Sequence, residues 1–289
     1  MDAMGGEAAL HAIHTISFKG VGSQNALEQS ERPEGPWITN YDQGTQAYDF
    51  ENGATRAENS TRGFFQLNWW DTEAWTNPSV VRTADGVSAF ESRGHTAPYL
   101  ATAVTEAQEA LFLNPLRILL HAAVAPDVHA QPDVQLHGFA QHVIAFTWDG
   151  NPVRIFLSSY SNTITAVEIT RALPSNLYFG PWGDVTTRTY FGAWNLETGG
   201  IHYPRLWYSE VNGQALGYHT ITQFRINPEL PADSFLIPDD VKQAFRAQGN
   251  SAIDETPFGN PKAPPKERAP GIVQVPGSWA VGEVRQDDG

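Results

Sequence analysis

Short segments in which every second residue is apolar recur along most of the chain, and they constrain its fold more than any other feature. Such alternation places apolar side chains on one face of a strand and polar side chains on the other. Pairs typical of tight turns separate several segments, as at Asp85-Gly86, Asp149-Gly150 and Asn212-Gly213. The alternating segments lie at 15–22, 37–48, 54–67, 79–91, 135–148, 152–159, 163–171, 184–194, 205–211 and 218–227. They predict about ten strands, joined mostly by hairpins in one antiparallel sheet.

One long apolar segment interrupts this pattern. Residues 102–124 carry apolar side chains at helical spacing, and Pro115 is expected to kink or divide the helix. A shorter helix is predicted over 7–14, directly before the first strand. A helix as apolar as 102–124 must cover a hydrophobic surface, which the sheet provides. The predicted fold class is mainly β (α+β), with a strongly curved antiparallel sheet and one long helix packed on its concave side.

Charge and composition exclude several classes of protein. The chain of 289 residues holds 18 Lys and Arg against 32 Asp and Glu, which gives a formal net charge of −14. Such a surface repels phosphate backbones, so we expect no nucleic-acid partner. The chain has no cysteine, which excludes disulfides, thiolate metal sites and thiol nucleophiles. No apolar run reaches the roughly 20 residues of a membrane span, so we expect no transmembrane segment.

Composition also bears on location and on domain organisation. Absent Cys with many Trp, Asn, Gly and Pro residues suits a periplasmic or secreted bacterial protein, although cytoplasmic proteins share this composition. Prolines crowd the segment that begins near Gly249, and strand patterning returns near Gly271. We therefore predict a folded domain over 1–246, a Pro-rich linker over 247–270 and the start of a following strand pair over 271–289. A continuation of the polypeptide or another chain would complete that pair.

A set of strand and turn motifs resembles a known family. The motifs are Asp149-Gly150, Leu173-Pro174, Gly183-Asp184-Val185, Tyr190-Phe191-Gly192-Ala193-Trp194, Gly200-Ile201-His202-Tyr203-Pro204, Ile226-Asn227-Pro228 and Phe235-Leu236-Ile237-Pro238. Over about 1–246, they resemble the N-terminal region that precedes metallo-β-lactamase-fold hydrolase modules in bacterial proteins. That region is similar to the curved antiparallel half-barrel of LolA/LppX-like lipoprotein carriers. Residues 269–279 resemble the opening strand of such a hydrolase module.

The resemblance implies a partner but no complete catalytic motif in this chain. The dinuclear zinc site of the hydrolase module needs a His-x-His-x-Asp-His sequence, and the nine histidines of this chain do not form one. The resemblance therefore implies an accessory ligand-binding or substrate-presenting domain of a metallohydrolase. The hydrolase module would lie in cis or on another chain. Zinc is expected only in that module, and no cofactor or metal is expected in this chain.

Aromatic residues supply the candidate ligand-binding site. Five aromatic residues fall within 64–75, in a segment with the character of a loop. Tryptophan offers a large contact area at small entropic cost, so these rings suit an apolar or aromatic small molecule or a docking partner. The equally weighted alternative is that they plug the open end of the curved sheet. The candidate ligand-binding residues are Trp69, Trp70, Trp75 and Tyr99.

Histidines and carboxylates support a second hypothesis, a freestanding small-molecule enzyme such as a hydrolase or lyase. Its site would lie in the concave face of the sheet, with His137, His142 or His202 as general base and Asp184 or Glu168 as its partner. Two histidines and a carboxylate converging in one pocket would favour this enzyme, whereas an apolar hollow would favour a carrier-like domain. A third hypothesis is a dimerisation domain, in which another chain, as in a homodimer, buries the edge strands and the strand after the linker.

A metal site is the weaker interpretation of the densest His and acid cluster, which is Asp127, His129, Asp133, His137 and His142. Pro126 and Pro132 forbid a continuous helix through it. On one strand, His137 and His142 are an odd number of residues apart and would point to opposite faces.

Overall fold

The computed structural model describes residues 1–27, 35–63, 75–173, 179 and 183–248, together with the strands at 266–269, 272–275 and 282–285. Its main feature is an open antiparallel sheet of 13 strands in the order β6-β5-β4-β3-β2-β1-β13-β12-β11-β10-β9-β8-β7. The first and last strands of this sheet, β1 (Thr15–Ala26) and β13 (Gln214–Ile226), pair at its centre. The chain therefore runs from the centre to one edge, crosses over, and returns to the centre from the other edge.

The two halves of the sheet are consecutive meanders. The first continues through β2 (Ile38–Asp49), β3 (Ala54–Gly63), β4 (Ser79–Ala84), β5 (Val87–Ser92) and β6 (His95–Pro98). The second contains β7 (His129–Leu136), β8 (Phe139–Trp148), β9 (Asn151–Ser158), β10 (Ile164–Ala172), β11 (Asp184–Leu196) and β12 (His202–Val211). The predicted curved antiparallel sheet is confirmed, with 13 strands in place of about ten.

The additional strands lie at the edges of the sheet. β6 has only four residues and ends at Pro98, while β7 is mostly exposed and contains Pro132. Neither shows a clean alternation, because an edge strand has little to bury. The turn at His137-Gly138, where both residues have positive φ, separates β7 from β8. The prediction of one continuous strand over 135–148 is therefore wrong.

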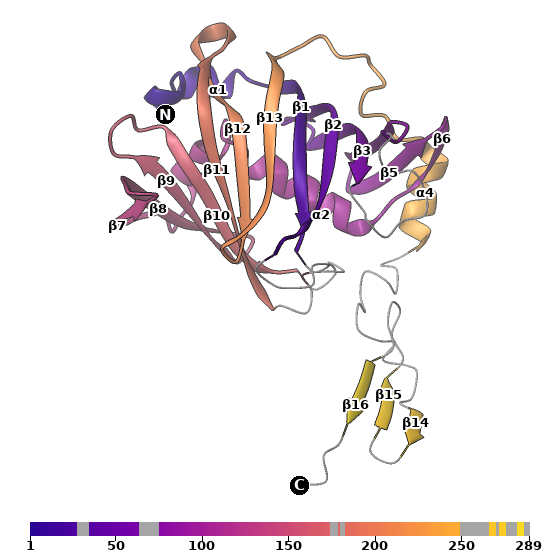
Figure 1. Ribbon diagram of the computed structural model, residues 1–289. Helices are drawn as coiled ribbons and strands as arrows, with labels where there is room; N and C mark the ends of the chain where they lie inside the picture. Colours follow the sequence, from indigo (N-terminus) through magenta and orange to yellow (C-terminus); the bar gives the residue numbers. More distant parts are fainter. Residues whose placement is uncertain are drawn as a thin grey trace.

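Helices cover the concave face of the sheet, which curves around them (Figure 1). The predicted long helix is divided into α2 (Ala101–Phe112) and α3 (Ile118–Val124), and Pro115 lies between them as expected. α1 (Glu7–His11) precedes β1, and the 3₁₀ turns η1 (Asp2–Met4) and η4 (Thr198–Gly200) are the other short elements. None of the helices in the described ranges has the length and hydrophobicity needed to cross a membrane.

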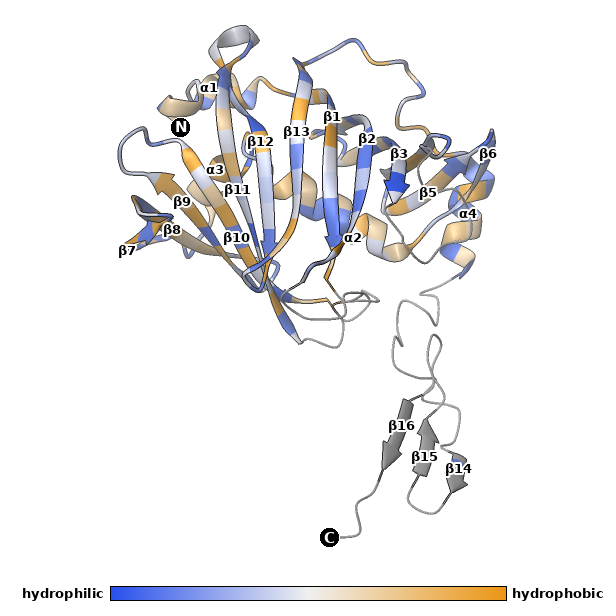
Figure 2. Cartoon of the chain, in the orientation of Figure 1, coloured by the Kyte–Doolittle hydropathy of each residue, from blue (hydrophilic) through white to orange (hydrophobic). Residues whose placement is uncertain are grey.

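The main core lies between these helices and the concave face. Ile16 and Phe18 of β1 pack there with Ile155 of β9, and all three are almost completely buried. Ile118 and Leu119 of α3 pack against the same cluster. Coloured by hydropathy, β8, β9 and β10 are much more hydrophobic than β2 and β3 (Figure 2). The core is therefore concentrated under the second meander.

A fourth helix, α4 (Asp239–Gln248), was not predicted. Its residue Val241 and the preceding Ile237 pack against Val87 and Ala89 of β5 in a small separate core. Most of α4 is exposed, so its apolar pattern is short and weak in the sequence. α4 thus packs with β5 and continues to Gln248.

The two edges of the large sheet are irregular or covered. β7 carries a bulge between Gln131 and Val134, at the position of Pro132. α4 packs beside β5 and β6 at the opposite edge. Such features interrupt the row of free backbone groups that an edge strand offers.

A separate small sheet lies near the end of the chain. It pairs β14 (Lys266–Ala269), β15 (Ile272–Val275) and β16 (Gly282–Arg285) in antiparallel order. The strand patterning predicted after Gly271 corresponds to β15 and β16. β14, however, falls inside the predicted linker, because three of its four residues pair with β15 despite the surrounding prolines.

Candidate functional site

A hollow between α2 and the concave face is the best-formed candidate site, and we call it the inner cavity. It consists of two adjoining parts of about 270 and 540 Å³, which share Glu106, Glu109 and Thr187. The smaller part lies against β10, β11 and β12, between Leu113 and Phe191. The larger part extends toward the far ends of β10 and β12, where Leu173 and Val211 lie.

The sequence of α2 places both polar and apolar side chains on the wall of this cavity. Glu106, Glu109, Ala110 and Leu113 follow the spacing i, i+3, i+4 and i+7, so they share one face of the helix and its end. The opposite wall comes from the inward-facing residues of β10, β11 and β12. These residues are Val167, Ile169, Thr187, Thr189, Phe191, Trp207 and Ser209.

One of the two acidic side chains in the cavity has an ion-pair partner. Arg171 Nη2 donates to Glu109 Oε1 at 2.6 Å, and Arg171 Nη1 donates to Thr187 Oγ1 at 3.1 Å. Burial nevertheless raises the pKa of the Glu109 carboxyl, and Arg171 opposes this rise. Burial and the neighbouring Glu109 raise the pKa of the Glu106 carboxyl, with Arg171 again acting in the opposite direction.

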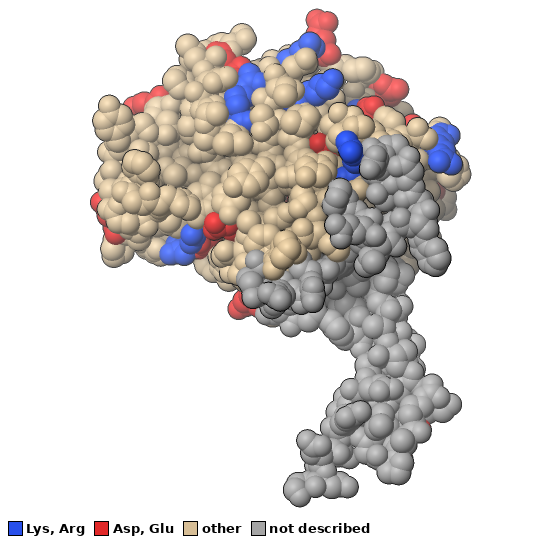
Figure 3. Space-filling model, viewed as in Figure 1, with Lys and Arg blue, Asp and Glu red and all other residues tan. Residues whose placement is uncertain are grey.

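The outer face of the sheet carries a second hollow, of about 620 Å³, which we call the outer groove. The described part of its lining includes Val21, Tyr41, Arg62, Trp75 and Tyr218. A broad area without Lys, Arg, Asp or Glu occupies the middle of the same outer face (Figure 3). This surface therefore offers aromatic and neutral polar contacts.

A row of tyrosines crosses the outer face beside the outer groove. Tyr190, Tyr208 and Tyr218 are cross-strand neighbours on β11, β12 and β13, and their ring centroids are 5.6 and 4.6 Å apart. Burial, followed by the nearby Glu210, raises the pKa of the Tyr208 hydroxyl to about 12. The Tyr208 hydroxyl therefore stays protonated at neutral pH and acts as a hydrogen-bonding group.

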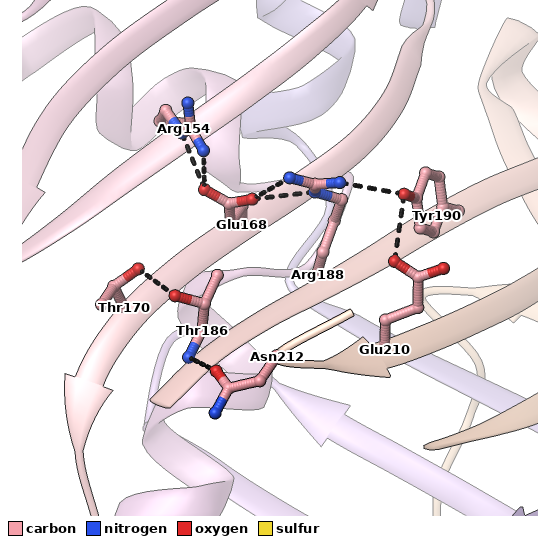
Figure 4. A network of polar contacts seen from close by, with 8 residues as sticks. All are labelled: Arg154, Glu168, Thr170, Thr186, Arg188, Tyr190, Glu210 and Asn212. Carbon is pink, nitrogen blue, oxygen red and sulfur yellow. Dashed lines mark hydrogen bonds and ion pairs between the residues drawn. The ribbon is translucent and has the colours of Figure 1, made fainter. Parts of the chain in front are cut away.

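Glu168 lies in a charged network on the outer face (Figure 4). It follows Val167, which faces the core, so it points to the opposite side of the sheet. Arg154 Nε and Arg188 Nε donate to its two carboxylate oxygens at 2.7 and 2.8 Å. Arg188 also donates to the hydroxyl of Tyr190 at 3.1 Å. The expectation that Glu168 would serve a site in the concave face is therefore wrong.

The histidines proposed as general bases lie in different places. His137 is in the β7–β8 turn, with its ring centroid 5.0 Å from that of Tyr190. His142 is exposed, and its Nδ1 lies 3.0 Å from Asp133 Oδ1. His137 and His142 are therefore on separate elements rather than on one strand.

His202 and Asp184 are also far from forming a pair. His202 begins β12 and Asp184 begins β11, and these antiparallel neighbours begin at opposite ends of the sheet. Within the described ranges, no three His, Asp or Glu side chains gather closely enough to hold a metal ion. The convergence that would favour the enzyme hypothesis is therefore not found in this part of the chain.

The proposed aromatic residues fall in two locations and one undescribed segment. Trp75 borders the outer groove. Tyr99 stacks on Phe90, with ring centroids 5.4 Å apart, and burial followed by the charge of Glu106 raises the pKa of its hydroxyl. Trp69 and Trp70 lie outside the described residues. Trp75 therefore borders the outer groove, whereas Tyr99 lines neither the outer groove nor the inner cavity.

Sequence reasoning missed a histidine–carboxylate pair on the concave face. His219 Nδ1 lies 3.6 Å from Asp42 Oδ2, and both side chains are partly buried. Burial lowers the pKa of His219 and raises that of Asp42. The imidazole lies across Gly22 of β1, where a Cβ would come within 2.7 Å of Nδ1. A glycine at an inward-facing strand position was the available signal, because it leaves room for a neighbouring side chain.

The acidic residues of the inner cavity were also missed. Glu106 and Glu109 interrupt the face of the apolar helix that covers the sheet. Charged residues at such positions are unusual, because a charge facing a core must be paired or must face a polar space. This break in the helical pattern was visible in the sequence.

Comparisons with known proteins give weak likenesses. No protein-family model matches the sequence, and no curated protein matches it. The chain is similar to the crystal structure of a domain assigned as an outer membrane lipoprotein-sorting protein from Vibrio parahaemolyticus. The TM-score is 0.44 at 8% identity, over 79% of this chain and 92% of that one. A second likeness, to MucB in complex with MucA(peri), has a TM-score of 0.22 at 10% identity, over 80% and 57%. With TM-scores below 0.5, these likenesses assign neither a family nor an activity.

Proposed function

We propose that this protein is a ligand-binding or substrate-presenting domain that holds a largely apolar small molecule in the inner cavity. The observation that carries the proposal is the inner cavity itself, a hollow between α2 and β10–β12. Its walls combine apolar side chains with hydroxyl, amide and charged groups. This combination is typical of sites that bind small molecules.

The construction of the cavity supports binding rather than catalysis. Leu113, Phe191 and Trp207 offer apolar surface, whereas Thr189 and Ser209 hydrogen-bond to each other at 3.1 Å. The hydroxyls are thus held in place by partners across the strands. A pre-formed cavity of this kind binds with little loss of conformational entropy.

The test is titration with N-phenyl-1-naphthylamine, a neutral apolar fluorophore whose emission rises in a dry site. We expect saturable binding at one site per chain. Ala110→Phe places a ring inside the smaller part of the cavity and should weaken binding at least about tenfold, which corresponds to about 1.4 kcal/mol.

The matched control is Gln108→Phe, which adds the same ring to α2 but on the side that borders a different hollow. This variant should bind as the wild type does. Absence of binding to the wild type, or equal binding by Ala110→Phe, would contradict the proposal. Circular dichroism of both variants separates a blocked cavity from an unfolded chain.

We further propose that the domain at 1–246 serves a metallo-β-lactamase-fold hydrolase module, beyond the linker at 247–270 or on another chain. Zinc would be held only by that module, in a periplasmic or secreted setting. The support is the sequence resemblance of 1–246 and of 269–279. The reading frame beyond Gly289 is the test of the arrangement in cis: a His-x-His-x-Asp-His sequence supports it, and an immediate stop codon contradicts it.

A further inference from the structure

Of the two glutamates that α2 places on the inner cavity, Glu106 and Glu109, only Glu109 has an ion-pair partner among the described residues. Glu109 is bound by Arg171, whose guanidinium also donates to Thr187. Glu106 has no hydrogen bond or ion pair with any residue that the structure describes. The three charged groups of the inner cavity, Glu106, Glu109 and Arg171, therefore carry one net negative charge when all are ionised.

Glu106 lies where a ligand would reach it. Its side chain borders both parts of the inner cavity and remains accessible, so it faces the hollow rather than a packed wall. Burial and Glu109 raise the pKa of its carboxyl, so both disfavour the charged form, and Arg171 opposes them only in part. A carboxylate in such a position gains most from a positively charged partner.

The rest of the cavity wall indicates what the partner would look like. Leu113, Phe191 and Trp207 supply apolar surface at the end of the smaller part. The hydroxyls of Thr187, Thr189 and Ser209 already have partners in Arg171 or in each other. Glu106 is therefore the charged group of the cavity that a ligand can engage without breaking an existing contact.

We propose that the inner cavity selects a ligand with an apolar body and a cationic amine head, and that Glu106 binds this head. This inference rests on the proposed ligand-binding function and adds the chemical class of the ligand. The amine would donate hydrogen bonds to the Glu106 carboxylate, and the apolar body would lie along Leu113, Phe191 and Trp207. An anionic head group would be repelled by the same net charge.

The test compares three probes with one ten-carbon chain and different heads: decylamine, 1-decanol and decanoate. Each probe displaces N-phenyl-1-naphthylamine at pH 7.5, below the concentration at which it aggregates. In the wild type, we expect decylamine to bind about tenfold more tightly than 1-decanol, and decanoate to bind most weakly. Glu106→Gln should lower decylamine affinity to that of 1-decanol and leave 1-decanol affinity unchanged.

The matched control is Glu229→Gln, which removes the same charge from an exposed residue that does not border the cavity. It should keep the preference for decylamine. Equal affinities for decylamine and 1-decanol in the wild type would overturn the inference while the proposed function stands, as would an unchanged preference in Glu106→Gln. Failure of all three probes and of the fluorophore would overturn both.

A pH series gives an independent readout. The charged groups that act on Glu106 are Glu109 on α2 and Arg171 on β10, whereas β11 and β12 contribute hydroxyls. Glu106 in turn raises the pKa of Tyr99, after β6. Protonation of Glu106 removes its charge, so decylamine affinity should fall as the pH is lowered from 7.5 to 5, while 1-decanol affinity stays constant. Parallel pH dependence of the two probes would contradict the role of Glu106.

Discussion

Aromatic side chains on the outer face are buried within the second meander of the sheet and exposed at and near the first. One cross-strand row on the outer face runs from Phe156 on β9 through Tyr190, Tyr208 and Tyr218 to Tyr41 on β2, with small residues between. Phe156 is 1% exposed, whereas Tyr218 and Tyr41 are 55% and 45% exposed. The same aromatic row is therefore core at one end and surface at the other.

The difference is set by what lies over each meander. Val134 and Leu136 of β7 pack over Phe156, and the guanidinium groups of Arg154 and Arg188 lie 5.4 Å from its ring. No comparable layer covers the outer face of β1 and β2 within the described ranges. β9 and β10 of the second meander are thus buried on both faces and provide stability, whereas the first meander presents polar and aromatic surface.

The sharpest way to break this comparison is to truncate the aromatic row at its two ends. Phe156→Ala should cost about 4 kcal/mol of unfolding free energy, because it opens a cavity in a tightly packed cluster. Tyr41→Ala, at the exposed end, should cost less than about 1 kcal/mol. Urea denaturation of both variants measures the difference, and equal costs would contradict the division into a buried and an open meander.

Glycines of the two meanders differ in the space around them, which gives a second, smaller contrast. A Cβ on Gly44 of β2 would lie 2.1 Å from the backbone oxygen of Glu58, whereas a Cβ on Gly192 of β11 has its nearest neighbour at 3.9 Å. Gly44→Ala should therefore destabilise by about 1–3 kcal/mol through overpacking. Gly192→Ala should be neutral or stabilising by up to about 1 kcal/mol. If thermal unfolding shows that Gly44→Ala is as stable as the wild type, β2 and β3 do not approach each other at Gly44 as closely as the structure indicates.

The smallest expected effect concerns pH. Burial depresses the pKa of His219 in the folded state, so the unfolded chain binds the proton more readily, and acidification through the ordinary range near 6.5 removes stability. Asp42, whose folded-state pKa is raised, acts in the opposite direction at lower pH. The wild type should therefore lose more stability than His219→Gln between pH 7.5 and 5.5.

The control for this prediction is His95→Gln, which removes an exposed histidine from β6. Its denaturation curves should follow those of the wild type at both pH values. Parallel curves for the wild type and His219→Gln would show that His219 is not buried in its neutral form.

The course of the chain was predictable where local signals are strong. Alternation and turn pairs located β8 to β13, and Pro115 predicted the division between α2 and α3. The edge strands β6 and β7 were missed because they bury little, and α4 because its apolar face is short. For these elements, tertiary contacts decide the structure more than local pattern does.

The candidate site was less predictable than the fold. His219 and Asp42 are distant in sequence and meet only because β1 lies between β2 and β13 at the centre of the sheet. The inner cavity likewise needs the crossover that carries α2 under β10–β12. Only the acidic break in the helical pattern of α2, at Glu106 and Glu109, was visible without these pairings.

The irregular edges of the sheet also affect how this protein can associate. Pro132 and the neighbouring bulge leave β7 a poor template for an incoming strand, and α4 stands beside β6 at the other end. Polymerisation by strand addition is thereby disfavoured at both ends of an open sheet. A second copy or a partner domain would have to dock through a face of the sheet or through loops. The backbone hydrogen bonds of each sheet would then stay within one copy.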